Sequence, residues 1–119
     1  MNEKIKELES TNLLNISEGL ANCGFDEDFY IEIVSDFINA LPIDELNKIL
    51  SERDIYLYQI TVHKLKSSSK IIGAGELSAS ALHMEELAKS KDLDALLSSH
   101  NDFINKCTNF KNIIEGIIK

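Results

Sequence analysis

Residues 54–74 read DIYLYQITVHKLKSSSKIIGA, and this stretch predicts one long amphipathic helix. Asp54 can cap the first turn with its carboxylate, and Gly73 can end the helix because glycine readily adopts the left-handed conformation found there. Between these two residues, apolar or small side chains recur three or four positions apart, which places them on one helical face. This stripe consists of Ile55, Tyr58, Val62, Leu65, Ser69 and Ile72. We therefore expect a helix over about residues 55–72 whose striped face is buried.

The rest of the chain has the composition of a helical protein, with one proline and five glycines among 119 residues. No segment shows the alternation and turn dipeptides of a β-hairpin. Further helices are expected over about residues 17–23, 26–53, 76–90 and 92–118. Residues 1–12 read as a polar tail or a frayed helix. The four longer segments predict an all-α protein, an antiparallel four-helix bundle over residues 13–119 with one or two short extra N-terminal helices.

The sequence also predicts the ends of the first short helix and the buried face of the helix that follows it. Ser17 is the expected N-cap of the first short helix, and Gly24 is its expected stop. The helix that starts at Asp26 is expected to bury one apolar stripe, and Pro42 is expected to kink it or to open its second half. The stripe consists of Phe29, Ile33, Phe37 and Ile38.

The charge and the cysteines disfavour several classes of function. The net charge of -8 disfavours non-specific binding of nucleic acid. Cys23 and Cys107 lack the C-x-x-C spacing and clustered histidines of a zinc site, so we expect two reduced thiols in an intracellular protein. The N-terminal MNEKIKELES lacks the apolar core of a signal peptide, and no run approaches the about 18 apolar residues of a membrane span. We therefore expect a cytoplasmic protein that does not engage a membrane.

The charge pattern singles out residues 55–74 as a surface for an anion. This stretch has only basic charges, although the chain contains 20 acidic residues. The lysines are Lys64, Lys66 and Lys70. His63 lies among them, with Lys66 three and Ser67 four positions further on, which makes both its neighbours on the helix surface. We expect His63 and Lys66 to face water, because the buried stripe passes through other positions.

An exposed imidazole flanked by ammonium groups is suited to carrying phosphate. Near neutral pH an imidazole is largely unprotonated and nucleophilic, and lysines can offset the charge of phosphoryl oxygens. Side chains within one or two turns of His63 are the further candidates for contact with phosphate or with a partner. Those near the phosphate are Gln59, Ser67 and Lys70, and those at a partner surface are Ile60 and Lys64.

Residues 63–74, HKLKSSSKIIGA, resemble the H-x-L-K-[GS]-[SA]-[SA]-x-x-[IL]-G-A signature of histidine-containing phosphotransfer (HPt) domains. Other positions look like those of bacterial members: Gly19-Leu20, Gly24, the run 26–30, Phe37 with Pro42, Leu77, Ala81 and Met84-Glu85. The resemblance covers about residues 13–118. It implies a four-helix bundle with His63 as the phosphorylated residue in mid-helix. It also implies that Lys66 interacts with the phosphoryl group, and that Ser67 stands where many members have Gly.

The resemblance implies a phosphorelay intermediate. His63 would accept a phosphoryl group from the phosphoaspartate of a response-regulator receiver domain and pass it to another receiver. The expected partners are receiver domains and a hybrid sensor kinase, with Mg²⁺ supplied by the receiver, because no tight acidic cluster lies near His63 in the sequence. No P-loop or kinase glycine loop occurs, so we expect a monomeric phosphocarrier without a metal or cofactor of its own, not an enzyme with an ATP-binding domain.

Two alternatives to a phosphorelay intermediate stay open. In the first, the chain is an HPt-like adaptor that binds receivers without transferring phosphate. In the second, it is the HPt module of a larger hybrid sensor kinase. Met1 and the short length favour a free-standing protein, whereas a gene that continues beyond Lys119 would favour the kinase module. His83 is expected at the solvent-facing rim, and His100 has no basic neighbours close in sequence, so neither is expected to carry phosphate.

Overall fold

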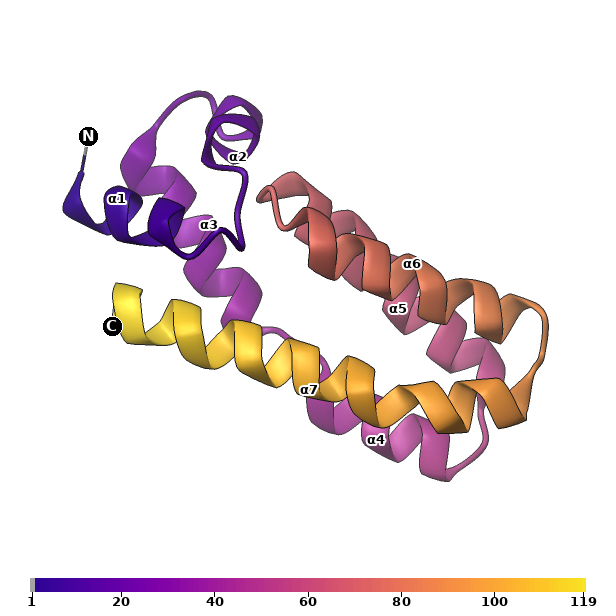
Figure 1. The fold of residues 1–119 in the computed structure, drawn as a ribbon. Helices are drawn as coiled ribbons and strands as arrows, with labels where there is room; N and C mark the ends of the chain where they lie inside the picture. The colour runs from indigo at the N-terminus through magenta and orange to yellow at the C-terminus, as the bar shows by residue number, and fades with distance from the viewer. Residues whose placement is uncertain (1) are drawn as a thin grey trace.

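The computed structural model describes residues 2–119, and within them the protein is all-helical (Figure 1). The helices are α1 (Glu3–Ser10), α2 (Ile16–Asn22), α3 (Glu27–Asn39), α4 (Ile43–Ser51), α5 (Ile55–Ile71), α6 (Gly75–Lys89) and α7 (Leu93–Ile118). Across the described residues, no helix combines the length and apolarity that a membrane crossing requires. The all-α class expected from the sequence is therefore confirmed.

The helices form an elongated molecule of 46 × 23 × 19 Å (Figure 1). Helices α5 and α6 are joined by a short turn and pack closely against each other as an antiparallel pair. Helix α7 returns along the molecule, where it packs on α6, α4, α3 and α1 in turn. The apolar faces of these helices meet in one core of buried side chains.

The helix predicted from residues 54–74 is present as α5, and its stripe is buried. The Asp54 side chain accepts a hydrogen bond from the Leu57 amide at 3.0 Å, and Gly73 ends the helix with a φ of 85°. Tyr58 and Val62 are fully buried, and the rest of the stripe lies in or against the core. His63 is not part of this buried stripe, and it therefore lies on the outer face of α5.

The N-terminal segment differs from the expected tail or frayed helix. Helix α1 packs on α7, α2 and α3, and its Ile5 and Leu8 are fully buried, because two apolar side chains three apart suffice to dock one short helix. The expected N-cap at Ser17 is wrong, because Asn15 caps α2 through a hydrogen bond from the Glu18 amide at 3.1 Å. The backbone N–H of Asn15 also donates to the Gly73 carbonyl at 2.8 Å, so a tertiary contact sets the start of this helix.

The expected stripe on α3 is wrong in phase at its N-terminal end. Phe29 is 46% exposed, whereas its neighbour Tyr30 is fully buried and donates a hydrogen bond to the Ile72 carbonyl at 2.7 Å. This buried hydroxyl contact turns the Tyr30 face toward the core. Pro42 opens a second helix, as one of the two expectations had it: α3 ends at Asn39, and α4 follows Pro42.

The C-terminal end of α5 is held by α2 and α3. Asn22 Nδ2 donates to the Ile71 carbonyl at 2.8 Å, beside the Tyr30 bond to the Ile72 carbonyl. Gly19 makes this close approach feasible, because a Cβ there would meet the Tyr30 ring and would lie 2.6 Å from the Ile72 carbonyl oxygen. The helix that carries His63 is thus anchored at the end where its carbonyls would otherwise lack partners.

Candidate functional site

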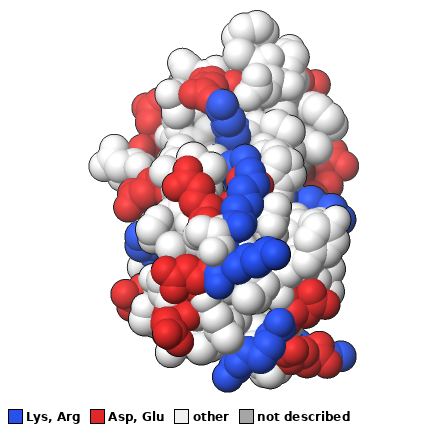
Figure 2. Space-filling model, turned by 90° about the vertical axis from the view of Figure 1, so that its right-hand side faces the viewer, with Lys and Arg blue, Asp and Glu red and all other residues white. Residues whose placement is uncertain are grey.

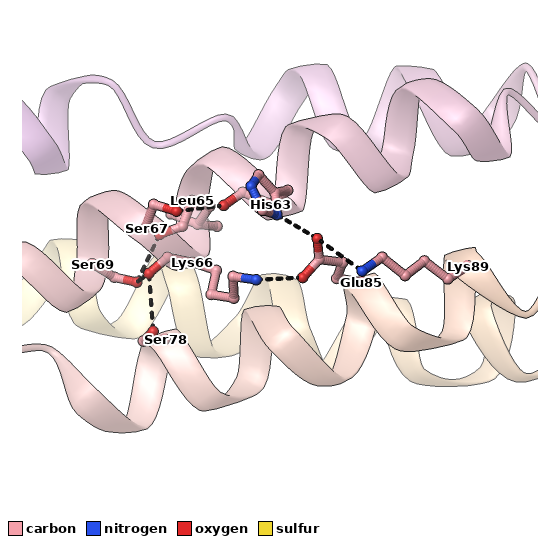
Figure 3. Close-up of polar contacts among 8 residues, drawn as sticks. All are labelled: His63, Leu65, Lys66, Ser67, Ser69, Ser78, Glu85 and Lys89. Carbon is pink, nitrogen blue, oxygen red and sulfur yellow. Dashed lines mark hydrogen bonds and ion pairs between the residues drawn. The ribbon is translucent and has the colours of Figure 1, made fainter.

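His63 lies on the outer face of α5 and contacts a buried carboxylate on α6. Its side chain is 56% exposed, whereas the Glu85 side chain is only 2% exposed. His63 Nδ1 and Glu85 Oε2 are 2.5 Å apart, which makes this contact a short hydrogen bond (Figure 3). One ring nitrogen is therefore held by the protein, and the ring remains open to solvent.

Two lysines share the same carboxylate. Lys66 Nζ donates to Glu85 Oε1 at 2.7 Å, and Lys89 Nζ lies 3.8 Å from Glu85 Oε2. Figure 3 shows the two lysines reaching Glu85 from opposite sides, while His63 reaches the same carboxylate from α5. Close packing of α5 on α6 brings the group together, and Ser78 adds a bond to the Lys66 carbonyl at 2.9 Å.

Glu85 is ionised near neutral pH despite its burial. The hydrogen bond from Lys66 is the largest influence and holds the pKa of Glu85 below its ordinary value. Burial acts in the opposite direction, and the contacts with His63 and Lys89 add to the lowering. An ionised carboxylate can only accept hydrogen bonds, so Nδ1 of His63 must be the donor.

This contact selects one tautomer of the neutral imidazole. With the proton on Nδ1, the lone pair lies on Nε2, which points away from Glu85 because the two nitrogens lie on different sides of the ring. Nε2 is then a nucleophile on a half-exposed side chain. A positive charge that develops on the ring during attack would face the Glu85 carboxylate. The arrangement suits nucleophilic attack on an electrophile that arrives from solvent.

The expectation that Lys66 faces water is wrong. Its side chain is only 25% exposed, because the lysine stem crosses to α6 and its ammonium group bonds Glu85. The positive charge nevertheless lies beside His63, since both side chains bond the same carboxylate. His63 itself is exposed as expected.

The other candidates on α5 do not join this contact network. Ser67 is exposed, and its hydroxyl donates to the His63 carbonyl at 3.3 Å, so it bonds its own helix. Lys70 is exposed and lines a hollow with Ser67 and two residues of α2. Gln59 and Ile60 are half-buried one turn before His63.

An apolar groove lies between α5 and the junction of α3 with α4, and its lining includes Lys64 but not His63. Its volume is about 430 Å³, and Lys64 forms part of its rim with Asp36. The apolar lining includes Ile33, Phe37, Leu41, Pro42, Leu65 and Ile71. Ile71 is 49% exposed, so this surface offers apolar contact area next to the helix that carries His63.

Glu85 and Lys89 are the site residues that sequence reasoning missed. The resemblance included Met84-Glu85 but assigned Glu85 no role. One signal was present: Glu85 lies on the face of α6 that buries Ala81 and Ala88, and an acidic residue on a buried face needs a cationic partner. Lys89 lies four residues after Glu85, which is the spacing of a helical ion pair.

The other two histidines differ from each other. His83 is exposed on α6, as expected. His100 is 6% exposed on α7, with Nδ1 2.8 Å from the Tyr58 hydroxyl and Nε2 2.7 Å from Asn47 Oδ1. Burial lowers the pKa of His100. A neutral ring that accepts from Tyr58 and donates to Asn47 satisfies both contacts, so this histidine is a core residue.

Among residues 2–119, no group of three or more His, Cys, Asp or Glu side chains is arranged to hold a metal ion. Comparison with protein-family models, with curated proteins and with solved structures finds no significant match to this chain.

Proposed function

We propose that the protein is a phosphorelay intermediate that carries a phosphoryl group on Nε2 of His63. One observation carries this proposal: the ionised, buried Glu85 lies 2.5 Å from Nδ1 of an exposed histidine, so the second nitrogen is free to act as a nucleophile. The two lysines on the same carboxylate supply positive charge beside His63.

The proposed step is an in-line displacement. The Nε2 lone pair attacks the phosphorus of an aspartyl phosphate on a receiver domain, an N–P bond forms, and the P–O bond to the aspartate breaks. The aspartate carboxylate leaves with the electron pair. The imidazole keeps its Nδ1 proton and becomes positively charged, and the Glu85 carboxylate stabilises that charge. Transfer to a second receiver is the reverse reaction with a different carboxylate.

The helix arrangement supports an HPt-type four-helix bundle as the architecture. The proposed bundle consists of α3 with α4, then α5, α6 and α7, and α1 and α2 are the extra N-terminal helices. Packing of α5 on α6 and α4, and of α7 on α6, α3 and α4, agrees with this arrangement. In such a bundle His63 projects from the middle of one long helix, where a globular partner can reach it.

The groove that Lys64 helps to line is the proposed docking surface for the receiver. It combines an apolar lining with Lys64 and Asp36, and Ile60 lies three residues before His63 on α5. Although the chain has a net charge of -8, Figure 2 shows basic side chains forming a band down one face, with acidic side chains on both sides. A mixed-charge surface of this kind favours a polar protein partner over nucleic acid.

The remaining parts of the proposal concern what the chain takes from its partners. Mg²⁺ is supplied by the receiver, and a receiver or a hybrid sensor kinase supplies the phosphate. The protein acts in the cytoplasm as a monomeric phosphocarrier and does not use ATP. An HPt-like adaptor that only binds receivers is the competing function, and phosphate transfer separates the two.

The experiment is incubation of the protein with phosphorylated receiver domains, followed by measurement of acid-labile, base-stable label. We expect wild-type protein and the His83→Gln variant to be labelled, and the His63→Gln variant to remain unlabelled with unchanged helical circular dichroism. Label that persists in the His63 variant would assign the phosphate to another residue. Binding of receivers without any label in the wild type would favour the adaptor.

A further inference from the structure

The single ammonium group of Lys66 has one partner in the structure and a different one in the proposed function. In the structure it bonds Glu85 Oε1 at 2.7 Å, the carboxylate oxygen that His63 leaves free. In the proposed function it also interacts with the phosphoryl group on His63. To approach a group on Nε2, the ammonium must move away from Oε1, since Nε2 lies on the side of the ring that faces away from Glu85.

Glu85 loses its short hydrogen bond to a lysine when Lys66 moves. The residue is 1% exposed, so water cannot replace this lost contact, and it is costly for a buried carboxylate to lose a hydrogen bond from a cation. Lys89 is placed to compensate. Its ammonium lies 3.8 Å from Oε2, beyond hydrogen-bonding distance but within ion-pair range, and its side chain is 56% exposed and therefore free to shift.

The charges of the site give a second reason. Two lysines and one carboxylate leave one net positive charge beside a neutral His63. Phosphorylation adds about two negative charges on the phosphoryl oxygens and one positive charge on the ring. With both lysines the phosphorylated site is close to neutral, whereas without Lys89 one negative charge remains unbalanced beside the N–P bond.

We propose that Lys89 is a positioning residue that replaces Lys66 as the cation on Glu85 when Lys66 turns to the phosphoryl group. The inference rests on the proposed function of His63 and extends it to a residue on α6. Lys89 acts through Glu85 and does not need to touch phosphate. It keeps Glu85 paired with His63 Nδ1 while the phosphoryl group is present.

The first test uses phosphoramidate, a small donor that needs no receiver. Nε2 of His63 displaces ammonia from phosphorus, and the half-life of the phosphorylated protein is then followed after the donor is removed. We expect Lys89→Gln to shorten the half-life about threefold to fivefold, the size of effect of one partly exposed ion pair. Lys89→Arg keeps the cation and should retain most of the half-life. Lys48→Gln, which removes an exposed lysine from α4, should leave it unchanged.

The second test uses the unphosphorylated protein and therefore does not depend on the proposed function. Urea unfolding is measured for Lys66→Gln, Lys89→Gln and the double variant. If Lys89 can replace Lys66 on Glu85, the double variant loses more stability than the two single variants together, because only then is Glu85 left without a lysine. Additive losses would overturn the replacement, as would a wild-type half-life in Lys89→Gln. Failure of phosphoramidate to label the wild type would instead count against the proposed function, and the unfolding data would still decide whether the two lysines substitute for each other.

Discussion

Replacement of Glu85 by glutamine tests the contact on which the site depends. Glu85→Gln keeps the size of the side chain but removes its charge, so the buried group no longer attracts Lys66 or requires a donor from His63 Nδ1. The glutamine amide can either accept from the ring or donate to it, and the tautomer of His63 is no longer selected. We expect both the folded stability and the rate of phosphorylation to fall.

The loss of stability can be sized from the two short contacts. A hydrogen bond to a charged group contributes about 1.5–3 kcal/mol, but here the partners are partly exposed, with 25% of the Lys66 and 56% of the His63 side chain accessible. Both partners regain water in the variant, so the net loss is smaller, about 1–2 kcal/mol. For a domain of this size that loss lowers the midpoint of thermal unfolding by about 4–8 °C.

The loss of rate comes from the tautomer and from the charge on the ring. If the carboxylate selects the nucleophilic tautomer and stabilises the imidazolium, its removal should slow labelling by about tenfold, or about 1.4 kcal/mol in activation free energy. The rate is measured with phosphoramidate under single-turnover conditions, and the tautomer is read from the ¹⁵N shifts of the His63 ring. Glu86→Gln is the matched control, because Glu86 is the next residue on α6 and is exposed. Wild-type labelling in Glu85→Gln would refute the role assigned to the carboxylate.

Three further predictions concern residues around this site. Because burial lowers the folded-state pKa of His100 below 6.5, its contribution to stability is complete above about pH 6.5 and is lost as the pH falls; urea midpoints at about pH 7.5 and 5.5 should differ less in His100→Gln than in the wild type. Gly19→Ala should destabilise the protein by about 1–3 kcal/mol in urea unfolding, because the added Cβ would lie 2.6 Å from the Ile72 carbonyl oxygen, and an unchanged midpoint would show that α2 can move. Ser67→Gly should cost about 0.5–1 kcal/mol through backbone entropy, and a faster transfer from one receiver at fixed concentration would show that the serine crowds the incoming partner.

The local sequence was sufficient to predict the helix that carries the site. Asp54, Gly73 and the buried stripe between them act over a single turn or along one helix face, so their effect can be read without knowledge of the fold. The same stripe places His63 on the outer face. This is why the exposure of His63 was predicted correctly.

Periodicity alone was less reliable where two faces of a helix are both apolar. On α3 the sequence places Phe29 and Tyr30 side by side, and either could begin a buried stripe. The choice depends on the Ile72 carbonyl, 42 residues further along the chain, which accepts the bond from the Tyr30 hydroxyl. Likewise, Ile5 and Leu8 are too few to predict a stable helix by themselves, and α1 is held by the surfaces of α7, α2 and α3.

The chemistry of the site was decided by tertiary structure. In sequence, His63 and Lys66 belong to a stretch without any acidic residue, which predicts an imidazole and an ammonium group exposed to solvent. Folding packs α6 against α5 and inserts Glu85, 22 residues from His63, between these side chains. A buried carboxylate draws nearby cations toward it because it has no water to stabilise its charge. The sequence therefore determined which helix carries the proposed nucleophile, and only the packing of two helices determined which nitrogen is free and where the positive charges lie.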